Sequence, residues 1–370
     1  MGMWRILLSV VLVITGLCYI YILRKVYKLK IISFLCSDSK VRKLILTIAL
    51  VTGISVSISL LLGTINAVVC IIYTCLIWLS VELLVGCLWL VTRKKIRISS
   101  DTRGLIALIC TFATLSCGWY FDHHVFKTTY TIKSSKVDKN LKIAMFSDSH
   151  IGTTFDADGF SKHMDKIQEE NPDILLIVGD FVDDSSSKDI TVACIERLSK
   201  FKTKYGVFFV MGNHDKGYYS SHIRGYSETD LIGWLEKKFV TVLKDEVKLI
   251  DNRIYIIGRI DYSSNRKKVD ELTGGVDHSK FLLLMDHQPV EFEQDVSSKI
   301  DLVVSGHTHG GQLFPFNQAV KWIGRNQMVY GMEKRKDTTF IVSSGISDWA
   351  LKFKTGTKSE FVIINIEPIK

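Results

Sequence analysis

The stretch from Gly306 to Gln312 reads GHTHGGQ. It carries two histidines that are separated by one residue and bordered by glycines. It follows Ile300–Val304, a largely apolar run that predicts a buried strand. Imidazole nitrogens bind metal ions, and glycines let a backbone turn tightly and approach a ligand closely. Taken alone, the two histidines could instead be ordinary loop residues whose ring nitrogens are satisfied by neighbouring polar groups.

Four more polar clusters follow predicted strands in the same way. Each cluster begins directly after a short apolar run, and the clusters are Ser147–His150, Gly179–Asp183, Gly212–Asp215 and Asp286–Pro289. In α/β proteins ligands bind outside the carboxyl ends of the strands. We therefore expect the five clusters to meet at one edge of the fold.

The residue types in these clusters suit one kind of chemistry. Aspartate, asparagine and neutral histidine are suitable ligands for manganese, iron or zinc. There are enough of them for two ions that share a bridging carboxylate, and two ions about 3.5–4 Å apart acidify a bound water and clamp a phosphoryl group. Such a reaction also needs an acid, such as a histidine that is not a ligand, to protonate the departing oxygen.

Each motif is a weak signal when considered alone. An Asp-x-His sequence arises by chance, the Gly-Asp-x-x-Asp carboxylates could cap a helix or a turn, and Gly-Asn-His-Asp could be a polar turn. A lone histidine such as His287 is more often structural. The order of the motifs and their placement after strands carry the prediction.

The elements that must position these clusters alternate between strand and helix patterns. Apolar runs at Lys142–Phe146, Ile174–Val178 and Gly206–Val210 alternate with helical spacing at Asp158–Glu170 and Ile190–Leu198. A helix over Thr229–Lys238 and a series of short strands follow, and a first edge strand is expected at Thr128–Ile132. This pattern predicts an α/β domain over residues 128–370.

Composition separates the chain into two parts. Of 370 residues 47% are hydrophobic, and the excess lies near the start, together with the excess of positive charge behind the net +9. The globular part is close to neutral, so the charge does not point to nucleic-acid binding. Its single cysteine, Cys194, excludes a disulfide framework and a CxxC zinc site there.

Residues 1–127 are expected to form a transmembrane helical region with about four spans. The apolar runs cover residues 4–23, 44–62, 68–91 and 104–121, each near the ~20 residues that cross a bilayer. The first is expected to be an anchor, since it lacks a small-residue cleavage site. The fourth is the least hydrophobic, and its alternative is a buried or interfacial helix.

The charges between the apolar runs predict how the chain crosses the membrane. The loops at 24–43 and 92–103 are rich in Lys and Arg, whereas the loop at 63–67 has none. The positive-inside rule places the two basic loops in the cytoplasm. With four spans in the cell membrane, the α/β domain over residues 128–370 is then expected on the extracytoplasmic side.

The set of motifs D-x-H, G-D-x-x-D, G-N-H-D, a lone His and G-H-T-H-G-G-Q resembles the calcineurin-like metallophosphoesterases over about residues 140–366. The last motif and the membrane region resemble the YkuE-like, membrane-anchored branch. This resemblance implies two packed mixed sheets flanked by helices, which is a four-layer α/β/β/α sandwich. It also implies a metal-dependent phosphoric ester hydrolase with two divalent ions, of which manganese is favoured over iron and zinc.

Carried over by motif, the resemblance assigns seven metal ligands and two further catalytic residues. Asp148, His150 and His309 would hold the first ion, and Asp180 would bridge both. The second ion would be held by Asn213, His287 and His307. In the same way His214 matches the acid for the leaving group, and Asp183 matches the carboxylate that orients it.

The resulting prediction is a membrane-anchored dinuclear phosphoesterase in which a metal-activated water attacks phosphorus and His214 acts as general acid. Position near a bilayer favours a lipid-linked or envelope phosphoester. One alternative is a phosphodiesterase or phosphatase for soluble nucleotides or phosphoproteins. Another is a non-catalytic membrane sensor that keeps the fold. The sequence does not predict an oligomeric state.

Overall fold

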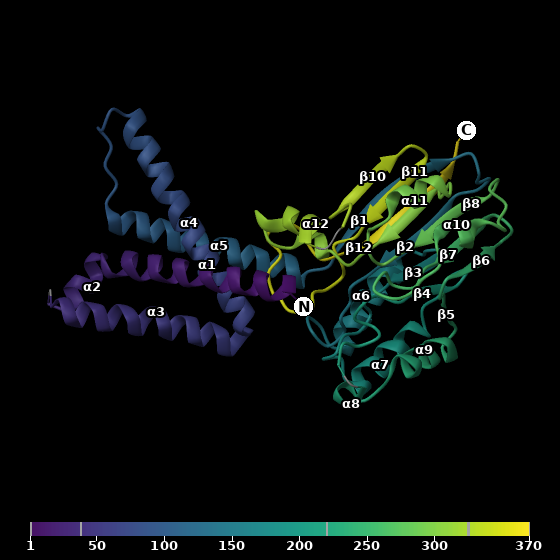
Figure 1. The fold of residues 1–370 in the computed structure, drawn as a ribbon, viewed down its shortest axis with the longest axis horizontal. Helices are drawn as coiled ribbons and strands as arrows, with labels where there is room; N and C mark the ends of the chain where they lie inside the picture. The colour runs from purple at the N-terminus through teal and green to yellow at the C-terminus, as the bar shows by residue number, and fades with distance from the viewer. Residues whose placement is uncertain (1, 38, 220, 324–325, 370) are drawn as a thin grey trace. The chain divides into compact units, whose positions relative to one another are not determined.

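The structure is a computed structural model that describes residues 2–37, 39–219, 221–323 and 326–369. The chain divides into two compact units, and Figure 1 traces their elements in chain order. The first unit holds Met1–Trp119 with Ala350–Lys352, and the second holds Tyr120–Trp349 with Phe353–Lys370. This geometric division does not test the domain limits expected at residues 127 and 128, which stay a proposal.

The first unit is helical. Its helices are α1 (Gly2–Tyr27), α2 (Lys30–Leu35), α3 (Lys40–Leu62), α4 (Thr64–Val91) and α5 (Ser100–His123). Four of these are long and apolar enough to cross a membrane, namely α1 from Arg5, α3, α4 and α5. Helix α5 extends through Asp122 and His123, beyond the end of the fourth apolar run of the sequence. The four apolar runs of the sequence are thus four helices.

The carboxylate of Glu82, inside the apolar helix α4, is paired with two basic side chains. Glu82 of α4 accepts hydrogen bonds from Lys25 of α1 at 2.6 Å and from Arg103 of α5 at 2.5 Å. An isolated carboxylate is costly in an apolar region, and such groups pair with each other or with polar partners. The contacts join three helices, so they support a structural role for Glu82.

The second unit contains two six-stranded sheets. The first has the order β1-β12-β2-β3-β4-β5, and the second has the order β10-β11-β9-β8-β7-β6. The strands of the first sheet are β1 (Phe126–Ser134), β12 (Glu360–Pro368), β2 (Leu141–Phe146), β3 (Ile174–Val178), β4 (Val207–Val210) and β5 (Val240–Val242). The strands of the second are β10 (Gly331–Arg335), β11 (Thr338–Val342), β9 (Leu302–Ser305), β8 (Phe281–Met285), β7 (Ile254–Gly258) and β6 (Glu246–Ile250).

The sheets pack face to face and are covered by helices on their outer faces. Alternate side chains of β2, such as Ile143 and Met145, join side chains of the second sheet, such as Leu283 and Val304, in one core. The other side chains of the first sheet face α6 (Ala157–Glu169), α7 (Lys188–Leu198) and α9 (Glu228–Lys237). On the far side of the second sheet lie α10 (Val269–Thr273) and α11 (Phe292–Ser297). The expected α/β/β/α sandwich is confirmed.

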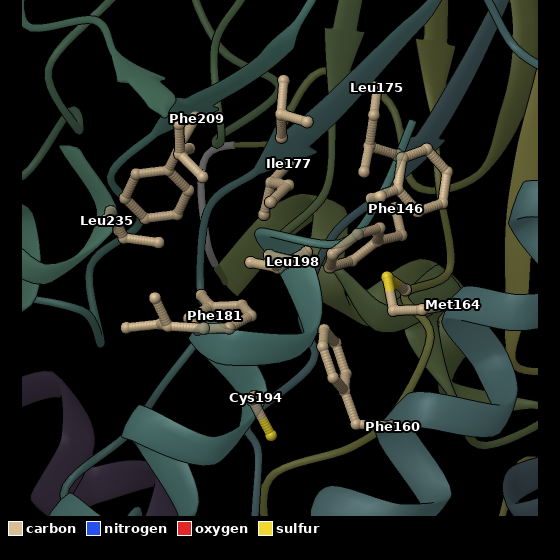
Figure 2. Packing of buried hydrophobic residues seen from close by; sticks show 14 of the residues in the cluster. Phe146, Phe160, Met164, Leu175, Ile177, Phe181, Cys194, Leu198, Phe209 and Leu235 are labelled. Atoms are coloured by element: carbon tan, nitrogen blue, oxygen red, sulfur yellow. The ribbon is translucent and has the colours of Figure 1, made fainter. Parts of the chain in front are cut away.

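Figure 2 shows the outer core of the first sheet, where side chains of β2, β3 and β4 face side chains of the helices. Phe146, Ile177 and Phe209 point from the strands toward Phe160 of α6 and Leu198 of α7. Every side chain of β3 is buried, as expected for a strand covered on both faces. This packing fixes the strand ends from which the polar clusters emerge.

Strands β2, β3, β4 and β5 are parallel to one another, and so are β7, β8, β9 and β11. Their carboxyl ends therefore lie on the same edge within each sheet. Strand β10 and the short segments α8 (Ser221–Arg224), α12 (Ala319–Ile323), η1 (His309–Gly311) and η2 (Phe316–Gln318) were not anticipated from the sequence. These segments lie in the loops around or beyond the strand ends.

Candidate metal centre

The five polar clusters follow β2, β3, β4, β8 and β9, and the structure brings them together. Two groups of potential ligand atoms form, and the atoms within each group lie within 4.8 Å of one another. One group contains Asp148, His150 and His309, and the other contains Asp180, His287 and His307. These groups contain the aspartates and histidines that the motifs assigned to the two ions. Asp180, the expected bridging residue, belongs to the second group.

Asp180 lies where a bridging ligand would have to lie. Its Oδ2 atom is 3.1 Å from His287 Nε2 and 3.8 Å from His150 Nε2, so it approaches a histidine of each group. Its Oδ1 atom accepts a hydrogen bond from the His214 backbone at 2.8 Å. In the first group, His309 Nε2 lies 3.6 Å from Asp148 Oδ1.

The backbone of the ligand loops is held in an uncommon conformation. Positive φ angles occur at several of the candidate ligand residues: Asp148, His150, Asp180, His307 and His309. Non-glycine residues reach this left-handed region at a cost, and they tend to do so at functional sites. The close approach of the loops also requires glycine, because a Cβ atom at Gly306 would lie 2.4 Å from Asp148 Oδ2.

Several buried polar atoms at the site have no hydrogen-bond partner in the described part of the chain. They are both ring nitrogens of His150 and Oδ1 of Asn213. Buried polar atoms are nearly always satisfied, so each exception calls for an explanation such as an ion. These donor atoms are types that divalent transition metals accept, and the residues present therefore fit a metal centre.

Hydrogen bonds on the far sides of two ligands decide which atom faces the site. His287 Nδ1 lies 2.9 Å from the carbonyl oxygen of Val178, and this contact turns Nε2 toward Asp180. The amide nitrogen of Asn213 donates to the hydroxyl of Tyr218 at 2.6 Å. The oxygen of Asn213 is therefore the atom left for a cation.

His214 lies beside the two groups without belonging to either. Its ring is 4.9 Å from the His150 ring, 5.0 Å from the Tyr218 ring and 5.7 Å from the Trp349 ring. A histidine at such a place could donate a proton to a group bound between the ligand sets.

The carboxylate of Asp183 contacts Ser185 and lies near His150. Among the described residues no hydrogen bond joins it to His214. One carboxyl oxygen accepts hydrogen bonds from the backbone and hydroxyl of Ser185, and the other lies 3.7 Å from His150 Nδ1. The turn at Ser185 fixes the carboxyl toward His150, so the orienting role toward His214 stays a prediction without a contact to support it.

The electrostatics of the site favour cations. Burial lowers the pKa of His150 well below its usual value, and it lowers that of His307 to about 4. Burial alone would also lower the pKa of His287, but the neighbouring Asp180 raises it well above the usual range. Burial would raise the pKa of Asp180, and His287 in turn lowers it well below normal. The buried aspartates therefore supply the negative charge that attracts a cation to this site.

Two further residues, Asp215 and Asp348, support the candidate ligands. Asp215 accepts hydrogen bonds from the backbone N–H groups of Asp180 at 2.8 Å and Gly212 at 2.7 Å, so it ties the loops after β3 and β4 together. Asp348 was missed, and its carboxylate lies 2.9 Å from His309 Nδ1. It stands after β11 in a polar stretch, Ser343–Asp348, which resembles the clusters after the other strands and could have been found by that signal.

Comparison with known proteins agrees with the geometry. The model of the calcineurin-like phosphoesterase family matches residues 141–311. A metallophosphoesterase of Aquifex aeolicus is 33% identical over 193 residues, which cover 50% of this chain and 70% of that protein. The metallophosphoesterase YkuE of Bacillus subtilis is 25% identical over 260 residues, which cover 67% of this chain and 88% of that protein.

Other relatives are longer than the matched region. The Bos taurus protein named transmembrane protein with metallophosphoesterase domain is 28% identical over 243 residues, which cover 60% of this chain and 52% of that protein. The chain spans 61% to 62% of the length of the Helicobacter pylori and Campylobacter jejuni metallophosphoesterases that it matches.

Proposed function

The chain belongs to the calcineurin-like metallophosphoesterases, and we propose that it is a membrane-anchored enzyme that hydrolyses phosphoesters with two divalent cations. The observation that carries the proposal is the pair of candidate ligand groups, one with Asp148, His150 and His309 and the other with Asp180, His287 and His307. Asp148, His150 and His309 would hold one ion, and His287, His307 and Asn213 would hold the other. Manganese is the ion we favour, since the donors are carboxylate, amide and imidazole.

When bound, the two cations would acidify a water and neutralise charge on the phosphoryl group. Side chains of the protein would donate the proton and position the other groups. His214 is the proposed acid that protonates the departing oxygen, because it borders both ligand groups and is a ligand in neither. Asp180 and Asp148 fix the histidines of the two groups, and Asp215 holds the loops of Asp180 and Asn213 in register.

For the substrate we propose a lipid-linked or envelope phosphoester. The chain carries four helices apolar enough to span a membrane, and a protein anchored in this way works beside lipids. Large aromatic side chains are exposed near His214: Trp349 is 49% exposed and Tyr218 is 57% exposed. Phe353, a further candidate for an apolar rim, is buried and does not contribute. On the positive-inside rule, we propose that the domain lies outside the cytoplasm.

The test uses the full-length chain purified in detergent. Metal content would be measured by mass spectrometry, and hydrolysis would be assayed with added Mn²⁺ on bis-p-nitrophenyl phosphate, nucleotides, a phosphopeptide and a lipid pyrophosphate. We expect two ions per chain and the highest kcat/KM on the lipid substrate. Preference for nucleotides or the phosphopeptide would overturn the substrate proposal. Two bound ions with no hydrolysis of any compound would favour the sensor alternative.

A further inference from the structure

We propose that Asp348 is a positioning residue that holds the imidazole of His309 toward the metal centre, and that Lys354 and Asp122 support it from behind. This inference rests on the proposed function only in taking His309 as a metal ligand. It adds to the site three residues that no motif assigns. Two of them follow β11, and the third lies in the last turn of α5.

The contact between Asp348 and His309 has the geometry of a ligand and its support. Asp348 Oδ1 lies 2.9 Å from His309 Nδ1, and the carbonyl oxygen of Ser347 lies 3.3 Å from the same nitrogen. With its proton on Nδ1, the ring presents Nε2 on the opposite side, which is the side of Asp148. Metal-binding histidines usually donate their other N–H to a carboxylate or a carbonyl, which fixes the tautomer and the ring orientation.

Lys354 supplies the positive charge that lets Asp348 remain a carboxylate in a dry environment. Both side chains are buried, at 0% and 1% exposed, and Lys354 Nζ lies 3.4 Å from Asp348 Oδ2. The same ammonium donates to the carbonyl oxygens of Ser344 at 2.8 Å and Ser347 at 3.3 Å. A buried charge without a partner is strongly destabilising, so the Lys354 ammonium stays in contact with Asp348 and with the carbonyl oxygens. These contacts hold the Ser344–Ser347 loop and the Asp348 carboxylate together.

Asp122 extends this support to the end of α5. Its side chain is buried, and its carboxyl lies close to that of Asp348. The last turn of α5 is fixed to the start of β12, because Ser359 donates from its hydroxyl to the Asp122 carbonyl at 2.6 Å and from its backbone to the Phe121 carbonyl at 2.8 Å. A chain of contacts therefore runs from α5 through Asp122 and Asp348 to His309.

The experiment measures metal binding, so that it does not depend on hydrolysis. The full-length chain in detergent would be stripped with a chelator and titrated with Mn²⁺, and free Mn²⁺ would be followed by electron paramagnetic resonance. We expect Asp348→Asn to weaken one of two sites by about 10–100-fold and to leave the other unchanged. Asp122→Ala should weaken the same site by a smaller factor.

Two further variants separate positioning from general damage. Asp295→Asn alters another buried carboxyl, in α11, and should change the unfolding temperature without changing either Mn²⁺ affinity. If Asp348→Asn does not fold because Lys354 is left unpaired, the double variant Asp348→Asn with Lys354→Met removes both charges together and should show the same loss at one site.

The possible results separate this inference from the proposed function. Wild-type Mn²⁺ affinities in Asp348→Asn and in the double variant would overturn the positioning role. So would an equal loss at both sites, because that is the result of a loosened fold. A wild-type chain that binds two Mn²⁺ ions but hydrolyses nothing would overturn the proposed activity alone, and one that binds no Mn²⁺ would overturn both.

Discussion

At the scale of single residues, the chemistry of the site depends on which atom of each side chain is left unpaired. His287 and Asn213 each use one polar atom to bond to the protein, at Val178 and Tyr218, and keep the other for the centre. His214 has no ligand position, and its ring borders those of His150 and Trp349. Residue type therefore makes the chemistry available, and the hydrogen bonds around it select the reacting atom.

The role of His214 gives a prediction at this scale. His214→Ala should lower kcat by about 10²–10⁴-fold on an alkyl phosphoester, because the departing alkoxide needs a proton. On p-nitrophenyl esters the loss should be much smaller, because p-nitrophenolate leaves without protonation. The measurement is kcat on both substrates, together with metal content.

A control is provided by His222→Ala, since His222 lies in the short helix α8 outside both ligand groups. It should leave kcat and metal content unchanged. An equal loss on the two substrates for His214→Ala, or a loss of bound metal, would contradict the role of general acid.

At the scale of elements, strand ends and glycines bring the ligand loops within reach of each other. The loop after β4 passes so close to the loop after β3 that a Cβ atom on Gly212 would lie 2.2 Å from Asp180 Oδ1 and 2.4 Å from the Asp180 backbone nitrogen. The backbone contact matters more, because a strand end cannot rotate away as a flexible side chain can. Glycine is therefore required at this crossing by close packing.

Two glycine substitutions should have opposite effects on the free energy of unfolding. Gly212→Ala should push the β3 and β4 loops apart, lower the free energy of unfolding by about 1–3 kcal/mol and weaken metal binding. Gly233→Ala lies in α9 with no atom within 4 Å of the new Cβ, and it should raise the free energy of unfolding by about 1 kcal/mol. Chemical denaturation and Mn²⁺ titration of the two variants would check this. Unchanged metal affinity in Gly212→Ala would contradict the packing argument.

At the scale of the whole molecule, the charge pattern and the apolar helices determine how the chain meets a membrane. Four helices are long and apolar enough to span it, and the basic loops stand before α3 and before α5. Glu82 is neutralised by Lys25 and Arg103, so it does not argue against burial of α4 in a bilayer. An even number of spans puts both ends of the helical region on one side.

The charge pattern of the loops gives a prediction about membrane topology. A reporter that is active only outside the cytoplasm should be active when fused after Asn140 and inactive when fused in the loop at 92–99. The positive-inside rule gives the reason, because the Lys and Arg residues of that loop resist translocation. Fusions after Asn140 that are inactive outside and active in the cytoplasm would overturn the four-span topology.

The sequence alone determined the residue types, their order and the strands that precede them. Apolar runs of about five residues identify buried strands, and candidate ligands placed after strands meet because parallel strands end at a common edge. For this reason the two ligand groups and the α/β/β/α architecture followed from local pattern and resemblance. The long apolar runs likewise identified the four helices.

Only the tertiary structure decided which side chains support those ligands. Asp183 turned toward His150 through contacts with Ser185, and Asp348 reached His309 from another loop. The insertion of β12 between β1 and β2 brought the end of α5 to the same place, although Asp122 and Asp348 are far apart in the chain. Such contacts depend on sheet order and on the packing of loops, and local sequence contains neither.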